Sequence, residues 1–154
     1  MTNARVAALR ALAAKRLTAA QLWTKLERKG YVDDEVRETV AWCRREGYVD
    51  DALYAQLFVE TTRKTVSDLR LVGDLVRRGI ERDVALDAVA KAERTQSDRL
   101  RAAFAKIERR RSDLSYPLAA RRLERLGFPA SSIYRFLREH AAQFGPLAGF
   151  EAAD

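Results

Sequence analysis

Residues 18–31 read TAAQLWTKLERKGY, and the pattern returns as SDLRLVGDLVRRGI at 67–80 and as SYPLAARRLERLGF at 115–128. The three segments align without gaps on a glycine near their ends. Successive glycines, at Gly30, Gly79 and Gly127, are 49 and 48 residues apart. A nearly constant spacing of this size is typical of tandem structural repeats.

Each segment carries the start and stop signals of one helix. A hydroxyl residue stands twelve positions before each glycine, at Thr18, Ser67 and Ser115, and predicts an N-cap. Thr18 and Gln21 have the spacing of a capping box. Each glycine is expected in the left-handed conformation, with a leucine four positions before it contacting the apolar residue after it. These pairs are Leu26 with Tyr31, Leu75 with Ile80, and Leu123 with Phe128.

A second helix is predicted after each glycine, because apolar residues follow at six and ten positions beyond it. A third helix is predicted before each segment, at roughly 4–15, 50–64 and 96–111. Strands are not expected, since no stretch alternates with period two. The predicted fold class is all-α, with three tandem three-helix repeats in an elongated, curved array. The predicted limits are 4–47, 48–94 and 95–142 for the repeats and 143–154 for a loosely ordered tail.

The five residues GYVDD occur twice, at 30–34 and at 47–51. The first copy joins two helices within a repeat, and the second joins one repeat to the next. In both, the glycine is expected to end a helix and an aspartate to cap the next one. Tyr48 is expected to contact Cys43 as Tyr31 contacts Leu26. The second copy, Gly47, Tyr48, Asp50 and Asp51, is therefore predicted to set the angle between repeats.

The bulk composition favours a folded protein with a polyanionic partner. The chain has 154 residues, 47% of them hydrophobic and 33% charged, with a net charge of +7. Residues 1–47 sum to +4, residues 48–95 to −1 and residues 96–154 to +4. No apolar run approaches a membrane span, and the start MTNARVAALR lacks a signal-peptide pattern. With a single cysteine, a reduced, cytoplasmic location is expected.

No pattern for catalysis, a metal or a cofactor is found, and the sequence predicts a protein that is not an enzyme and holds no cofactor. His140 has no Cys or His at ligand spacing and is expected at the surface or at a helix end. Cys43 falls in the apolar register of its helix. Phosphate-binding glycine loops are missing from the sequence, and the carboxylates are expected at solvent-facing helix positions.

Arginines are the candidate binding residues, because the planar guanidinium suits phosphates and carboxylates. One arginine stands two positions before each of the three glycines. There it could either bind a partner or satisfy the carbonyls at the end of its own helix. A run of three adjacent arginines favours a negatively charged partner. The candidates for contact with DNA or a protein–DNA filament are Arg28, Arg44, Arg45, Arg77, Arg78, Arg109, Arg110, Arg111, Arg121, Arg122 and Arg125.

Residues 47–80, GYVDDALYAQLFVETTRKTVSDLRLVGDLVRRGI, resemble the central signature of the RecX regulatory proteins. Residues 8–31 are similar to the first repeat of that family, and the third repeat keeps the register through LERLGF. The chain departs from the family pattern at Ser67, where members often have glycine, and at Asp74, where Glu is usual. Both departures affect only the fine shape of one loop.

The resemblance implies a non-catalytic regulator of the RecA recombinase, built of tandem three-helix repeats. Such proteins lie in the groove of the RecA–DNA filament and inhibit ATP hydrolysis, strand exchange and co-protease activity. The expected partners are the RecA filament and single- and double-stranded DNA, with bare DNA bound weakly or salt-dependently by a monomer.

Two alternatives stay open on the residues alone. A helical nucleic-acid-binding protein acting without a recombinase would bind bare DNA with a steep salt dependence. A protein-interaction scaffold would bind one protein, independently of salt, and no DNA. The helix pairs around each glycine resemble helix–turn–helix units, but the second helices predicted in the first two repeats begin with acidic residues, which DNA phosphates repel.

Overall fold

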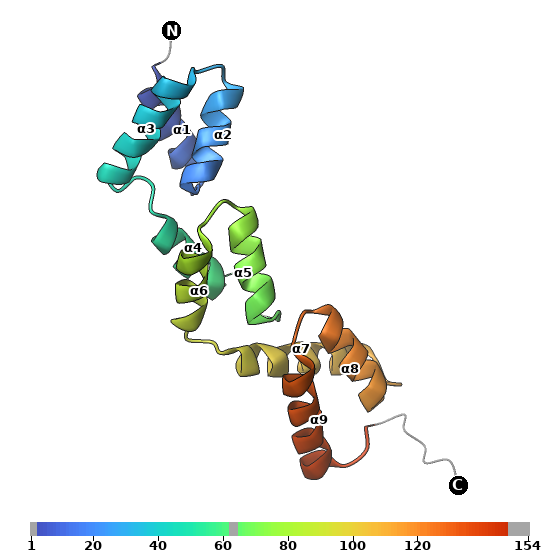
Figure 1. Ribbon diagram of the computed structural model, residues 1–154. Helices are drawn as coiled ribbons and strands as arrows, with labels where there is room; N and C mark the ends of the chain where they lie inside the picture. Colours follow the sequence, from blue (N-terminus) through green and yellow to red (C-terminus); the bar gives the residue numbers. More distant parts are fainter. Residues whose placement is uncertain (1–2, 62–64, 148–154) are drawn as a thin grey trace. The chain divides into compact units, whose positions relative to one another are not determined.

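The computed structural model describes residues 3–61 and 65–147, and in these residues it contains nine α-helices and no strand (Figure 1). The predicted all-α class is therefore confirmed for this part of the chain. The helices are α1 (Ala4–Ala14), α2 (Ala19–Arg28), α3 (Asp33–Arg45), α4 (Asp51–Thr61), α5 (Asp68–Arg77), α6 (Arg82–Ala90), α7 (Gln96–Arg110), α8 (Tyr116–Arg125) and α9 (Ala130–Phe144).

The chain forms two compact units, and the boundaries between them fall inside α4 and α5. Unit 1 comprises Met1–Phe58 and Val72–Lys91, and unit 2 comprises Val59–Leu71 and Ala92–Asp154. The repeat limits 4–47, 48–94 and 95–142 stay a prediction. Of the predicted tail 143–154, residues 143 and 144 belong to α9 and residues 148–154 lie outside the described part. The predicted end of the fourth helix, at 62–64, also lies outside it.

The predicted N-caps of α2, α5 and α8 are all present. The hydroxyl oxygens of Thr18, Ser67 and Ser115 accept from backbone N–H groups three residues later, at 3.1, 3.1 and 3.3 Å. The Gln21 side chain also accepts from the Thr18 N–H at 3.0 Å, which completes the predicted capping box. Each cap satisfies a backbone N–H that the helix itself leaves free.

The glycine corners after these helices are Schellman motifs, as the sequence predicts. Gly30, Gly79 and Gly127 have φ of 94°, 89° and 92°. In each case the N–H of the residue after the glycine donates to the carbonyl of the leucine four positions before the glycine, as from Tyr31 to Leu26 at 3.3 Å. Only glycine adopts this backbone conformation without strain, so these residues fix where each helix ends.

The two copies of GYVDD differ at their aspartates. In the first copy Val32 is the N-cap of α3 and makes no side-chain cap bond, so the prediction that an aspartate caps this helix is wrong. Asp33 and Asp34 instead lie in its first turn, where they favour the helix dipole. In the second copy Asp50 does cap α4, since its carboxylate accepts from the Leu53 N–H at 3.0 Å.

The side chain of Tyr48 also departs from expectation. Its N–H donates to the Cys43 carbonyl at 2.9 Å, so the corner closes as predicted. The ring, however, lies against Trp42 with centroids 5.5 Å apart, and the residue is 51% exposed. Tyr48 therefore packs beside the helix it follows rather than over Cys43.

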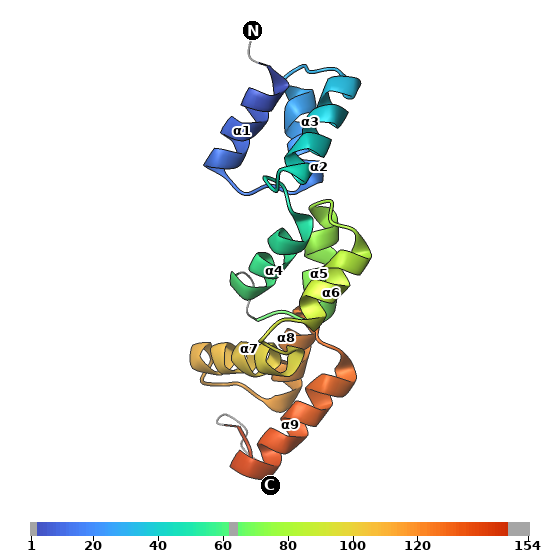
Figure 2. The ribbon, with the colours of Figure 1, turned by 90° about the vertical axis from the view of Figure 1, so that its left-hand side faces the viewer.

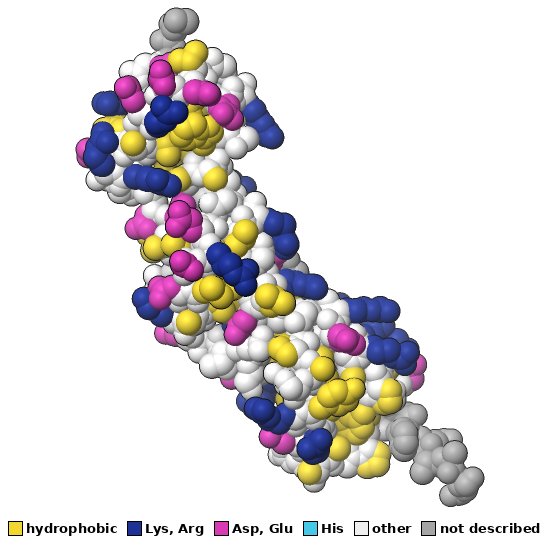
Figure 3. Space-filling view, viewed as in Figure 1, with side chains coloured by type: hydrophobic (Ala, Val, Ile, Leu, Met, Phe, Trp, Pro, Cys, Tyr) yellow, Lys and Arg dark blue, Asp and Glu magenta, His cyan; other side chains and the backbone are white. Residues whose placement is uncertain are grey.

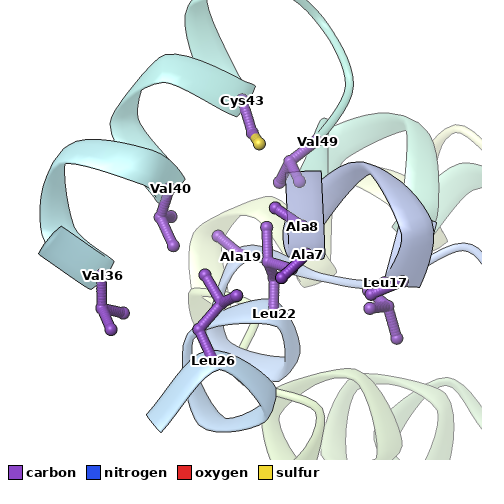
Figure 4. Packing of buried hydrophobic residues seen from close by; sticks show 11 residues of the cluster. Ala7, Ala8, Leu17, Ala19, Leu22, Leu26, Val36, Val40, Cys43 and Val49 are labelled. Carbon is purple, nitrogen blue, oxygen red and sulfur yellow. The ribbon is translucent and has the colours of Figure 1, made fainter. Parts of the chain in front are cut away.

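The core of unit 1 lies among α1, α2 and α3, which lie side by side in Figures 1 and 2. Figure 4 shows its residues converging from the three helices, among them Leu22 and Leu26 of α2, which are 0% exposed. Burying a leucine completely contributes about 1.5–3 kcal/mol relative to exposing it. Cys43 is part of this cluster, as predicted, and burial raises the pKa of its thiol.

The core of unit 2 lies among α7, α8 and α9 and includes Phe104, Leu123 and Leu137. His140 lies near the end of α9, one of the two positions expected from the sequence, but its side chain is only 13% exposed. Its ring packs against Phe104 and Phe144, with centroid distances of 4.7 Å to each. Its Nδ1 lies 3.0 Å from the Tyr116 hydroxyl, which donates to the Gly145 carbonyl at 2.5 Å. Tyr116 of α8 therefore contacts both His140 of α9 and the residue that follows α9.

A first joint, inside unit 1, fixes the beginning of α2 against the end of α5. The Thr18 hydroxyl donates to the Arg78 carbonyl at 2.7 Å, and the Ala19 N–H donates to the Asp51 carboxylate at 2.9 Å. Gly79 packs so closely that an added Cβ would overlap the Cβ of Ala20. The joint therefore depends on the same glycine that ends α5.

A second joint, inside unit 2, repeats this arrangement at the beginning of α5 and the end of α8. The Ser67 N–H donates to the Leu126 carbonyl at 3.4 Å, and the Asp68 N–H donates to the Gln96 side chain at 2.8 Å. A Cβ added at Gly127 would lie 2.6 Å from the Ser67 hydroxyl oxygen. Asp51 and Gln96, the first residues of α4 and α7, therefore have equivalent roles.

Candidate polyanion-binding hollows

In the described residues, no side-chain hydrogen bond to a helix carbonyl is found for the three arginines that recur before the glycines. Arg28, Arg77 and Arg125 each occupy the last turn of a helix and are exposed. Within 3–61 and 65–147, no hydrogen bond or ion pair is found for Arg28 or Arg125. Arg77 pairs with the Asp74 carboxylate. Two of the three guanidinium groups therefore remain available for an external anion.

Arg28 and Arg77 line one hollow in unit 1, together with the end of α2, the start of α2 and the corner after α5. This α2–α5 basic hollow has a volume of about 620 Å³. Leu17, Ala20 and Gly79 are among the residues that line it. Of the described residues, six cations and no carboxylate line it: Lys15, Lys25, Arg28, Lys29, Arg77 and Arg78.

The first joint produces this concentration of charge. Because Gly79 packs on Ala20, the basic end of α5 lies beside the basic side of α2. Arg78 is fixed there by two contacts: one guanidinium N–H donates to the Tyr54 hydroxyl at 2.7 Å, and the guanidinium carbon lies 4.7 Å from the centroid of the Phe58 ring. Arg77 pairs with Asp74, and the other cations leave an excess of positive charge that favours binding of an anion.

Unit 2 holds a second, smaller hollow of about 300 Å³, the α7–α8 basic hollow. Its apolar residues are Ala103, Ile107 and Leu126, and Thr65 also lines it. Five cations and no carboxylate of residues 3–61 and 65–147 also line it: Lys106, Arg110, Arg111, Arg122 and Arg125. Figure 3 shows Lys and Arg side chains close together over α8.

One cation of this hollow has a fixed partner just outside it. Arg111 donates two hydrogen bonds to the Asp113 carboxylate, at 2.9 and 2.7 Å. This pairing raises the pKa of Arg111 and lowers the pKa of Asp113. In the described residues, no ion pair is found for Lys106, Arg110, Arg122 or Arg125, so the hollow keeps an excess of positive charge.

The structure separates the predicted arginines into four groups. Arg28, Arg77 and Arg78 meet in one hollow and Arg110, Arg111, Arg122 and Arg125 in the other. Arg44, Arg45 and Arg109 are exposed and line neither. Arg121 lines a separate hollow of α8 and α9 with Tyr134 and Glu124.

Sequence reasoning missed several residues that build these hollows. Four lysines line the hollows, although the sequence predicts arginines alone as binding residues: Lys15, Lys25, Lys29 and Lys106. The spacing of Lys25 and Arg28, one helical turn apart, was an available signal.

The sequence also gave no indication that Arg99 is buried, with 1% exposure. Its guanidinium donates to the carbonyls of Val66 and Arg94, at 2.8 Å each, and pairs with Asp68. Asp74 is likewise 8% exposed, contrary to the expectation that carboxylates face solvent.

Across 3–61 and 65–147, no group of three or more His, Cys, Asp or Glu side chains is arranged to hold a metal ion. None of the helices in these residues is both long enough and apolar enough to cross a bilayer. We take the two basic hollows as the candidate binding sites.

Comparison with known proteins gives consistent similarities. The family pattern described as the first three-helix domain of RecX matches residues 4–43. Regulatory protein RecX of Trichlorobacter lovleyi is 35% identical over 107 residues, covering 68% of this chain and 69% of the relative. Regulatory protein RecX of Amycolatopsis mediterranei is 30% identical over 145 residues, covering 87% of this chain and 81% of the relative.

Coverage varies among the relatives. The match to Regulatory protein RecX of Caldanaerobacter subterraneus subsp. tengcongensis, 36% identical over 78 residues, spans only 40% of that relative. Among solved structures, RecX from Lactobacillus salivarius superposes with a TM-score of 0.74 at 20% identity, over 88% of this chain and 93% of that one. This structural likeness concerns the fold alone.

Proposed function

The chain belongs to the RecX family of regulatory proteins, and from this premise we propose that it is a non-catalytic regulator of the RecA recombinase. It binds in the groove of the RecA–DNA filament and lowers ATP hydrolysis, strand exchange and co-protease activity. DNA alone is bound weakly, in a salt-dependent manner.

The observation that carries the proposal is the pair of basic hollows. Each collects cations from separate helices, and no carboxylate of the part of the chain that the structure describes lines either hollow. A filament of an ATP-hydrolysing protein on DNA presents both phosphates and acidic side chains, and both are ligands of such hollows. The proposed contacts are therefore the lining residues rather than every arginine of the sequence.

The rival function, a helical nucleic-acid-binding protein acting without a recombinase, would need a helix that enters a DNA groove. The helix following the first glycine corner, α3, has Asp33, Asp34 and Glu35 in its first turn, all of them exposed. DNA phosphates would repel this turn. This observation favours the filament over bare duplex DNA.

The test is ATP hydrolysis by RecA assembled on single-stranded DNA, titrated with this protein, with binding to bare DNA followed at the same salt concentration. We expect inhibition at concentrations too low to cover the free DNA. Inhibition only after the DNA is saturated, or none at all, would refute regulation of the filament and favour the rival function.

Matched variants locate the contact. Arg28→Glu reverses a cation inside the α2–α5 basic hollow, and Arg45→Glu reverses an exposed cation in the last turn of α3, outside it. We expect Arg28→Glu to weaken inhibition by about tenfold and Arg45→Glu to have little effect. Equal losses would mean that net charge alone governs binding.

A further inference from the structure

The two hollows differ in ways that suggest different ligands. The α2–α5 basic hollow is about 620 Å³, and half of its six cations are lysines. The α7–α8 basic hollow is about 300 Å³, and four of its five cations are arginines. A lysine ammonium acts as a point charge, whereas the arginine fork makes two parallel hydrogen bonds to a carboxylate or a phosphate.

Apolar residues form part of the smaller hollow. Ala103 is buried, while Ile107 and Leu126 are partly exposed and pack against the core of unit 2. A ligand that fills the hollow therefore covers apolar surface as well as neutralising charge. An aliphatic surface is suited to an aliphatic side chain.

A nucleic acid strand matches these residues less well. Proteins that bind single strands stack the bases on aromatic side chains. Among the described residues, no aromatic side chain lines the α7–α8 basic hollow. Its apolar residues are Ala103, Ile107 and Leu126. These side chains are aliphatic and offer a base no aromatic ring on which to stack.

We propose that the α7–α8 basic hollow binds an acidic peptide segment of a protein partner, with carboxylates on Arg110 and Arg122 and one aliphatic side chain on Ile107 and Leu126. The inference deepens the proposed function and rests on it only for the expectation that the segment comes from the regulated protein. Arg111, already held by Asp113, contributes less than the cations without a partner.

The chain offers two matched controls for this site. Arg110 lines the hollow and its neighbour Arg109 does not, although both are exposed in the last turn of α7. On α8, Arg122 lines it and Arg121 does not, and both are exposed. Each pair allows the same charge reversal at adjacent residues, inside and outside the hollow, with the same effect on net charge.

The experiment measures binding of a short fluorescent peptide rich in Asp and Glu, with one central leucine, by anisotropy and without RecA or DNA. We expect Arg110→Glu and Arg122→Glu each to lower affinity by about tenfold, and Arg109→Glu and Arg121→Glu by less than about threefold. Replacing the central leucine by serine is expected to lower affinity by about tenfold as well. Circular dichroism confirms that each variant is folded.

Two outcomes would overturn the inference. Equal losses from all four reversals would show diffuse attraction instead of a site. An oligonucleotide of equal charge that binds more tightly than the peptide, and is lost selectively in Arg110→Glu and Arg122→Glu, would assign the hollow to nucleic acid. Selective peptide binding without any effect on RecA would keep this inference and reject the proposed function.

Discussion

The first and second joints use one backbone arrangement with different side chains. In both, a left-handed glycine, Gly79 or Gly127, packs on the beginning of an earlier helix. In both, the first residue of another helix accepts from the first N–H of that earlier helix. The acceptor is the carboxylate of Asp51 in the first joint and the neutral amide of Gln96 in the second. The close packing of the glycine is therefore common to both joints, while the side chain that accepts the hydrogen bond is charged in one and neutral in the other.

The position of the arginine differs as well. In the first joint the residue before the glycine, Arg78, donates to Tyr54 of α4 and lies over the Phe58 ring. In the second joint Arg99 of α7, three residues after Gln96 as Tyr54 is after Asp51, donates to two carbonyls. A guanidinium stabilises each joint, but it comes from opposite sides. The backbone contact is therefore the fixed requirement, and the polar side chains vary.

The largest expected effect is the loss of the second joint through Arg99→Met. The substitution keeps apolar volume but leaves the Val66 carbonyl and the Asp68 carboxylate without their donor. We expect the free energy of unfolding to fall by about 4 kcal/mol. Urea denaturation measures this, with the exposed neighbour Arg101→Met as the control. A loss equal to that of the control would contradict the role assigned to Arg99.

Substitution of the joint glycines is expected to have the next largest effect. In Gly79→Ala the new Cβ overlaps Ala20, and the backbone is also left-handed, so we expect a loss of about 3 kcal/mol. Gly47 has a φ of 79° but nothing within 4 Å of an added Cβ, so Gly47→Ala should cost only about 1 kcal/mol.

A second substitution separates overlap from backbone strain. Ala20→Gly removes the atom that the new Cβ would meet, so it should restore part of the stability lost in Gly79→Ala. The measurement is a double-mutant cycle by thermal unfolding. Strictly additive effects would mean that the corner moves away from Ala20 at no cost.

The two capping acceptors allow a direct comparison of charge. A hydrogen bond to a carboxylate is stronger than one to an amide, so Asp51→Ala should cost about 2 kcal/mol and Gln96→Ala about 1 kcal/mol. Asp51→Asn replaces the carboxylate by a neutral amide, as in the second joint. We expect it to lower the free energy of unfolding by about half as much as Asp51→Ala does. Chemical denaturation measures all three variants. Equal losses for the two alanine variants would show that charge is immaterial here.

Backbone features could be predicted from the sequence because they depend on a few residues close together. The caps at Thr18 and Ser67 and the corners at Gly30 and Gly79 require only local geometry, and the structure confirms them. The exception, Asp33, illustrates the limit. An aspartate can act one residue before or after the helix begins, and composition does not decide between these positions.

Side-chain groupings could not be predicted, because they depend on which helix end lies beside which helix side. Arg121 and Arg122 are indistinguishable in the sequence, yet only Arg122 lines the α7–α8 basic hollow. Arg99 lies on a helix rich in charged residues, and nothing in that pattern indicates burial, since arginine is rarely buried. Its partners are a carbonyl and a carboxylate about thirty residues earlier in the chain.

The smallest expected effect concerns the capping boxes near the two joints. In α2 the box pairs Thr18 with the neutral Gln21, whereas in α7 it pairs Thr95 with Asp98. Hydrogen bonds from the Thr95 N–H and hydroxyl group lower the pKa of Asp98. A carboxyl with a lowered pKa in the folded state adds stability above its ordinary value of about 4, and loses it as the pH falls through the lower folded value.

The α7 box should therefore weaken in acid while the α2 box does not. Asp98→Asn is expected to flatten the dependence of stability on pH below about pH 4, and Gln21→Glu is expected to introduce such a dependence at α2. Amide hydrogen exchange in the first turn of each helix, followed from neutral to acidic pH, measures the two boxes separately. Parallel acid weakening of both boxes in the unaltered protein would mean that global unfolding, rather than the Asp98 carboxylate, governs the acid response.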